Sequence, residues 1–96
     1  MIVDMVTFRV RPERIAEFEK HNEDWVRMMR RARGFITQVL MRSLDHPHEF
    51  TAEVRWVNRE YRDRFNVADD PDRKALQQRA HDLLDGPPRS VLLESV

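Results

Sequence analysis

The feature that most constrains this chain is an alternating segment that ends in a tryptophan at position 56. Its even-numbered residues are apolar and would share one face of a strand: Phe50, Ala52, Val54 and Trp56. Its odd-numbered residues would share the other face and are mostly polar: Thr51, Glu53, Arg55 and Val57. Asn58, a residue type typical of a helix N-cap, follows at once. The pattern therefore predicts a large flat ring at the mouth of whatever lies under the sheet, which is where a ligand would bind.

The rest of the chain supplies three more strands and three helices. The patterns predict strands over 2–10, 35–44, 49–57 and 90–96, and helices over 11–34, 58–68 and 70–86. Gly34 is expected to end the first helix, and the turn over 45–48 to join two strands into a hairpin. The order β-α-β-β-α-α-β is that of an α+β, ferredoxin-like fold with a four-stranded antiparallel sheet. We expect one domain over residues 1–96.

In such a fold the helices cover one face of the sheet and leave the other bare. If Trp56 points toward the helices, the alternation along the other strands predicts which residues lie on the bare face. They are mixed but largely apolar: Val3, Met5, Thr7, Ile36, Gln38, Leu40, Thr51 and Val57. A second copy, packed sheet on sheet by two-fold symmetry, is the simplest cover. We therefore expect a homodimer that forms an α/β barrel, with a pocket between each sheet and its own helices.

The first predicted helix carries one apolar stripe with an amide inside it. The stripe consists of Ile15, Phe18, Trp25, Val26, Met29 and Ala32. Asn22 lies within it, and an unpaired buried amide costs on the order of 1 to 3 kcal/mol, so Asn22 should face a polar cavity or a buried backbone acceptor. His21 lies at the edge of the stripe, about 80° to 100° from its centre, and is expected at the surface.

Aromatic and apolar residues on several elements are expected to line the pocket. They are Phe8, Phe18, Trp25, Trp56, Tyr61, Phe65 and Leu83. Such a lining favours a small, planar, hydrophobic ligand over a free sugar.

Charge and composition exclude several classes of function. The chain has 17 basic and 17 acidic residues, so it lacks the positive surplus that binds nucleic acid. It has no cysteine, and no apolar run approaches the roughly 20 residues of a membrane span. His46 and His48 flank a proline in a turn, where their side chains would diverge, so we expect no metal site. Without an apparent signal peptide, the expected location is the cytoplasm, with no membrane partner.

Three segments together resemble the antibiotic biosynthesis monooxygenase family of dimeric α/β barrels. They are Arg33-Gly34-Phe35, the turn and strand start over 45–50, and Trp56-Val57-Asn58-Arg59-Glu60-Tyr61. The resemblance extends from Val6 to about Leu84. These motifs describe a scaffold more than a reaction. In haem-degrading members of that family an asparagine and an iron-ligating histidine fall at the positions of Thr7 and Phe65, so that activity is not expected here.

The resemblance implies a cofactor-free oxygenase that acts on a planar phenol, anthrone or quinol. Its substrate must lose a proton before it can pass an electron to dioxygen, and polar groups must hold the resulting oxyanion in a dry pocket. Trp56, Asn22 and Tyr61 are the candidates for that role. No cofactor and no metal are implied.

Two alternatives remain open. His21-Asn22 followed by Trp25 resembles the first helix of rhamnose mutarotases, in which a histidine at this place exchanges a proton with the sugar. A barrel that binds a small ligand without chemistry would explain the apolar lining equally well.

Overall fold

Four strands form one antiparallel sheet in the order β2-β3-β1-β4. The computed structural model describes residues 1–96 and gives these bounds: β1 (Ile2–Arg9), the 3₁₀ helix η1 (Pro12–Arg14), α1 (Ile15–Met29), β2 (Phe35–Arg42), β3 (Glu49–Trp56), α2 (Arg59–Val67), α3 (Pro71–Leu83) and β4 (Arg89–Glu94). The predicted α+β, ferredoxin-like fold is confirmed. None of the helices is long and apolar enough to cross a membrane.

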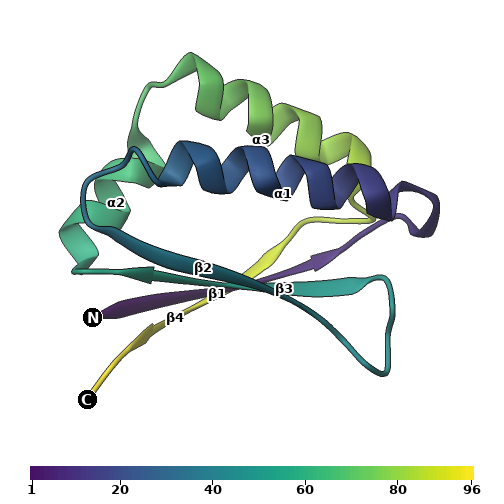
Figure 1. Cartoon of the computed structure of the whole chain (residues 1–96), viewed down its shortest axis with the longest axis horizontal. Helices are drawn as coiled ribbons and strands as arrows, with labels where there is room; N and C mark the ends of the chain where they lie inside the picture. Colours follow the sequence, from purple (N-terminus) through teal and green to yellow (C-terminus); the bar gives the residue numbers. More distant parts are fainter.

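All three α-helices lie on the same side of the sheet, and the opposite side is bare (Figure 1). Two of the helices begin at the expected caps. Asn58 Oδ1 accepts a hydrogen bond from the Tyr61 amide at 3.0 Å, and Asp70 Oδ1 accepts one from the Asp72 amide at 2.9 Å. Residues 68–70 separate α2 from α3, as the break in the last helical region predicts.

The first helix is shorter than predicted. It ends at Met29 and not at Gly34, because its last carbonyls accept from amides only three residues ahead, Arg31 to Met28 and Ala32 to Met29. Gly34 adopts a φ of +86° five residues beyond the helix, in the turn that leads into β2. Its role is to let the chain pass against the Tyr61 ring, which would overlap a side-chain carbon placed there.

Two residues of β2, Gln38 and Leu40, do not lie on the bare face of the sheet as predicted. A β-bulge between Phe35 and Thr37 shifts the register by one, so that Gln38 pairs with Val54 and Leu40 with Ala52. Because a one-residue shift exchanges the two faces of a strand, Gln38 and Leu40 point toward the helices and not to the bare face. Val39 and Met41 take their places outside.

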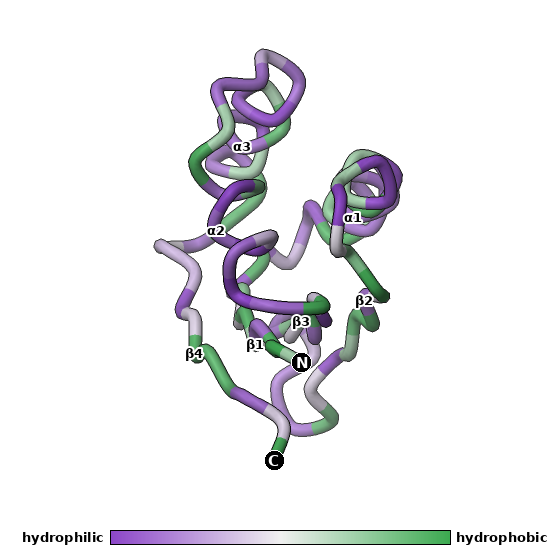
Figure 2. The backbone as a smooth tube through the Cα atoms, turned by 90° about the vertical axis from the view of Figure 1, so that its left-hand side faces the viewer, coloured by the Kyte–Doolittle hydropathy of each residue, from purple (hydrophilic) through white to green (hydrophobic).

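The inward face of the sheet carries two clusters of buried side chains. Ile2, Ala52, Val54 and Trp56 pack with Met29 of α1 at one end. At the other end Val10 and Phe50 pack with Phe18, Leu83 and Leu84. The helix α3 packs chiefly on α1, and Figure 2 shows that it stands farther from the sheet than α1 does. Space for a site therefore lies between the clusters, under α1 and α3.

Candidate functional site

A cavity of about 590 Å³ lies between the inward face of the sheet and the helices. Its walls come from β1, β2, β3, all three α-helices and the loop that follows α3. Its size falls in the range of small-molecule sites, which are mostly apolar with a few placed polar groups. The expectation that a pocket lies between the sheet and its own helices is confirmed.

The structure brings most of the predicted site residues to this cavity. Those that line it are Phe8, Phe18, His21, Asn22, Trp25, Trp56 and Phe65. Leu83 does not line it but fills the second core cluster, and the next residue, Leu84, contributes to the wall. Tyr61 lies outside the cavity, in a smaller surface cleft that includes Arg31, Arg33 and Arg64.

Trp56 ends β3 at the inward position that the alternation predicts and is 1% exposed. Its ring contacts Phe65, with centroids 5.4 Å apart, and Phe35 edge-on at 5.7 Å. The indole Nε1–H is buried and has no acceptor within the protein. An unpaired buried donor is costly, so this N–H is a ready partner for a ligand oxygen.

Asn22 forms a side-chain pair with Gln38 across the cavity wall. Gln38 Nε2 donates to Asn22 Oδ1 at 2.6 Å, whereas Asn22 Nδ2 and Gln38 Oε1 are 3.5 Å apart. The second contact is at the limit of a hydrogen bond, so the Asn22 amide group retains donor capacity. Asn22 therefore lies at a polar part of the cavity wall, and its half-buried partner is a side chain and not the backbone.

His21 is buried, at 7% exposure, which corrects the prediction of a surface histidine. The reason is tertiary: α3 packs over that side of α1, and the His21 Nε2 lies 2.7 Å from the Leu76 carbonyl oxygen. Since a carbonyl only accepts, Nε2 carries the proton and Nδ1 keeps a free lone pair in the neutral ring. Burial lowers the pKa of His21, against the opposing effect of the Leu76 carbonyl, and favours this neutral form.

Arg73 of α3 also lines the cavity. Its guanidinium carbon lies 5.5 Å from the centre of the Phe65 ring and 5.9 Å from that of Trp25. Its Nε is buried without a partner. Burial lowers the pKa of Arg73, and Asp70 opposes that effect.

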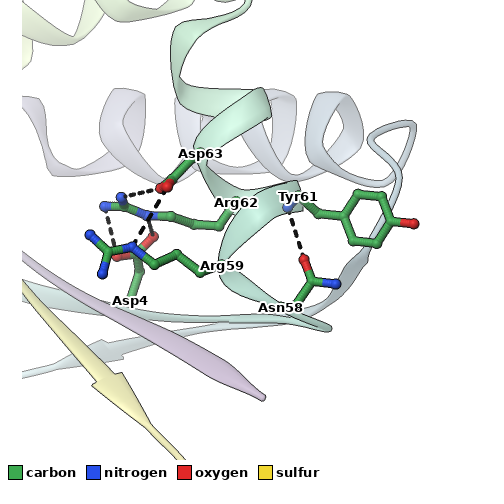
Figure 3. A network of polar contacts seen from close by, with 6 residues as sticks. All are labelled: Asp4, Asn58, Arg59, Tyr61, Arg62 and Asp63. Carbon is green, nitrogen blue, oxygen red and sulfur yellow. Dashed lines mark hydrogen bonds and ion pairs between the residues drawn. The ribbon is translucent and has the colours of Figure 1, made fainter.

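An ion pair closes the part of the cavity wall formed by β1. Asp4 accepts from Arg62 of α2 through both oxygens, at 2.9 Å from Nε and 3.2 Å from Nη2, and Asp63 accepts from the Arg62 Nη1 at 2.9 Å (Figure 3). Hydrogen bonding to Asp4, the largest effect, raises the pKa of Arg62. The Tyr61 ring points away from this network (Figure 3), consistent with its place outside the cavity.

Six polar residues of the cavity wall were not predicted: Asp4, Gln38, Asn66, Arg73, Gln77 and His81. Asp4 could have been recognised, because it is an acid that lies between Ile2 and Val6 on an otherwise apolar strand face. Gln38 was assigned to the wrong face because nothing in the sequence marks the bulge. Arg73 lies among polar residues on α3, where a surface arginine and a cavity arginine have the same local sequence.

Comparisons with known proteins agree with this geometry. The family described as antibiotic biosynthesis monooxygenase matches residues 1–70. No curated protein matches the chain. Among solved structures, a conserved protein from Methanosarcina mazei Go1 superimposes with a TM-score of 0.87 at 18% identity, over 99% of this chain and 92% of that one.

Two further structures share the fold. SnoaB from Streptomyces nogalater, a cofactor-independent oxygenase solved as a mutant, gives a TM-score of 0.85 at 19% identity, over 98% of this chain and 91% of that one. Rv0793 from Mycobacterium tuberculosis superimposes with a TM-score of 0.81 at 18% identity, over 99% of this chain and 94% of that one. At these identities the likeness concerns the fold.

Proposed function

Because the chain belongs to the antibiotic biosynthesis monooxygenase family, we propose that it is a cofactor-independent oxygenase of a planar phenol, anthrone or quinol bound in the cavity under α1 and α3. The observation that carries the proposal concerns Trp56, which lines the cavity and whose buried indole N–H has no acceptor in the protein. SnoaB, whose fold is similar, is described as an oxygenase of the same type.

The reaction begins with loss of a proton from the bound substrate. The neutral His21 ring is suited to accept it at Nδ1, because Nε2–H is already held by the Leu76 carbonyl. For an anthrone, the carbanion then passes an electron to dioxygen, and recombination gives a carbon-bound hydroperoxide. Elimination of water leaves a carbonyl, so that the methylene group and O₂ yield the ketone and H₂O.

Negative charge on the substrate oxygen must be held while the electron is transferred. The indole N–H of Trp56 and the amide N–H of Asn22 are the two donors suited to this task. Both residues line a largely apolar cavity, where a hydrogen bond to an oxyanion is stronger than in water. Tyr61, which lies outside the cavity, has no part in this scheme.

Oxygen uptake by the metal-free protein tests the proposal. With an anthrone or quinol we expect uptake above the buffer rate. Trp56→Phe, which removes the N–H but keeps a flat ring, and Asn22→Ala should each lower kcat about 100-fold if they remove an oxyanion donor. Gln78→Ala on the exposed side of α3 is the matched control and should leave the rate unchanged.

Absence of uptake across a panel of phenols, anthrones and quinols would overturn the oxygenase proposal. Binding of these compounds without uptake would instead identify a small-ligand barrel that carries out no chemistry.

The buried position of His21 also favours a second candidate, a sugar mutarotase. A neutral imidazole with one free nitrogen in a cavity is the group that anomer exchange requires. Saturation-transfer NMR on free hexoses should then show faster exchange, abolished by His21→Ala. Exchange at the solvent rate would exclude this candidate, and the aromatic lining favours the oxygenase.

We further propose that the protein is a homodimer joined through the bare face of the sheet. Apolar residues there are 38% to 57% exposed: Val39, Met41, Val57, Val91 and Leu93. They belong to β2, to β4 and to the position that follows β3, on the side that no helix covers (Figure 1). A second copy would bury them sheet on sheet.

Sedimentation at micromolar concentration should give twice the chain mass of 11.6 kDa. Leu93→Lys, on the outward face of β4, should shift the equilibrium to the monomer, while Gln78→Lys on α3 should not. A wild-type monomer at these concentrations would contradict the proposal.

A further inference from the structure

The cavity wall contains one charged side chain that forms no ion pair within the protein. Asp4 is neutralised by its bidentate pair with Arg62, and burial keeps His21 in its neutral form. Arg73 remains. It forms no ion pair, and Asp70, whose charge favours the protonated guanidinium, also caps α3 by accepting from the Asp72 amide.

The surroundings of Arg73 are aromatic and not acidic. The guanidinium lies over the faces of Phe65 and Trp25, which stabilise a cation but accept none of its hydrogen bonds. Its Nε–H is buried and unpaired. An arginine stays protonated at any physiological pH, so a half-buried guanidinium with a buried, unpaired Nε–H and no ion-pair partner favours binding of an anion.

Arg73 and Trp56 share one neighbour. The centre of the Phe65 ring is 5.5 Å from the Arg73 guanidinium carbon and 5.4 Å from the centre of the Trp56 ring. A flat ligand that contacts Phe65 therefore lies close to both the indole and the guanidinium. All three side chains line the same cavity.

We propose that the cavity selects planar aromatic acids, whose ring system contacts Trp56 and Phe65 while the carboxylate pairs with Arg73. This inference rests on the proposed function for the aromatic part of the ligand and adds the acidic group. A carboxylate matches the planar fork of arginine and replaces the solvent contacts that burial removes. Arg73 is then the residue that determines which aromatic compounds bind.

Binding of one matched pair of compounds tests the proposal. The probes are 1-hydroxy-2-naphthoate and its methyl ester, which share the ring and differ in charge, titrated by isothermal calorimetry. The wild-type protein should bind the acid about tenfold or more tightly than the ester, since one charged hydrogen-bonded contact contributes about 1.5 to 3 kcal/mol. Salt should weaken binding of the acid and leave the ester unchanged.

Two variants identify the residue responsible. Arg73→Met keeps an apolar stem against Phe65 and Trp25 but removes the charge, and should abolish the preference for the acid while the ester affinity stays within about twofold. Arg79→Met, farther along the same helix, removes an arginine that instead pairs with Asp24 at 2.8 Å. It should keep the wild-type preference.

The outcomes separate this inference from the proposed function. Equal binding of acid and ester by the wild-type protein would overturn the role of Arg73 while leaving an aromatic site in place. Failure of both naphthalenes and of a neutral anthrone to bind would overturn the aromatic site itself. The comparison of acid and ester in wild-type protein decides the matter even if Arg73→Met does not fold.

Discussion

Gln38 of β2 donates from Nε2 to Oδ1 of Asn22 on α1 over 2.6 Å, and so ties the sheet to the helix above it at the wall of the cavity. The bond exists only because the bulge at the start of β2 turns Gln38 inward. The reverse contact, at 3.5 Å, is long. Each amide thus depends on the other for the better of its two bonds.

We predict that Gln38→Leu lowers the free energy of unfolding by about 1 to 2 kcal/mol, because it leaves Asn22 Oδ1 unpaired beside an apolar side chain. Asn22→Leu should have a similar cost. The double variant should recover part of the loss, since neither polar group remains. Urea titration of all four proteins measures this coupling. Strict additivity of the two single effects would show that the pair is not an energetic unit.

Asp4→Asn should lower the free energy of unfolding by about 2 kcal/mol, since it removes the charge-assisted hydrogen bonds between the buried Asp4 and Arg62, whose remaining acidic partner is the half-exposed Asp63. Glu60→Gln on the same helix α2 is the matched control. Its partner Arg64 is exposed, so its loss should cost less than about 1 kcal/mol. The midpoints of guanidinium unfolding give both values. Equal effects would mean that burial adds nothing to the Asp4 pair.

The free energy of unfolding should fall as the pH is lowered below about 6.5. Burial lowers the pKa of His21 in the folded state below its ordinary value of 6.5, so the unfolded chain binds a proton first. The stabilisation is therefore complete above pH 6.5 and is lost as the pH falls toward the folded pKa. Urea titrations from neutral to mildly acidic pH should show a smaller slope for His21→Gln than for the wild-type protein. The wild-type slope should persist in Gln78→Ala.

Gly34→Ala should be more destabilising than Gly86→Ala. Both glycines have a positive φ, +86° and +105°, so either alanine carries a backbone cost of about 1 to 2 kcal/mol. At Gly34 the new methyl group would also overlap the Tyr61 ring, whereas nothing lies within 4 Å at Gly86. Overpacking adds about 1 to 3 kcal/mol. Thermal unfolding compares the two variants, and equal losses would show that Tyr61 gives way without cost.

The regular elements were predictable because their signals are local. The alternation over 50–57 placed Trp56 inward, and Asn58 and Asp70 fixed the starts of two helices. The end of α1 was less predictable, since the presence of Gly34 indicates a left-handed residue but not whether a helix ends there. The structure uses that glycine for its close approach to Tyr61.

The polar half of the site depends on contacts between distant elements. The burial of His21 follows from the position of α3, 55 residues away at Leu76. The inward position of Gln38 follows from one extra residue in β2. Arg73 has no distinguishing sequence context, and only the joint approach of α1 and α2 gives it two aromatic neighbours. Periodicity within one element contains none of this information.

The packing of α3 on α1 has a consequence for how a ligand enters the cavity. Because this helix packs along α1 and meets the sheet layer only at its C-terminal end, where Leu83 packs with Val10 and Phe50, its N-terminal part can shift without breaking a hydrogen bond between the strands. Its tether along α1 consists of the His21 bond to Leu76 and the Arg79 pair with Asp24. His21, the group suited to take the substrate's proton, therefore also holds α3 to α1. Protonation at Nδ1 would leave its Nε2–H free to go on donating to the Leu76 carbonyl.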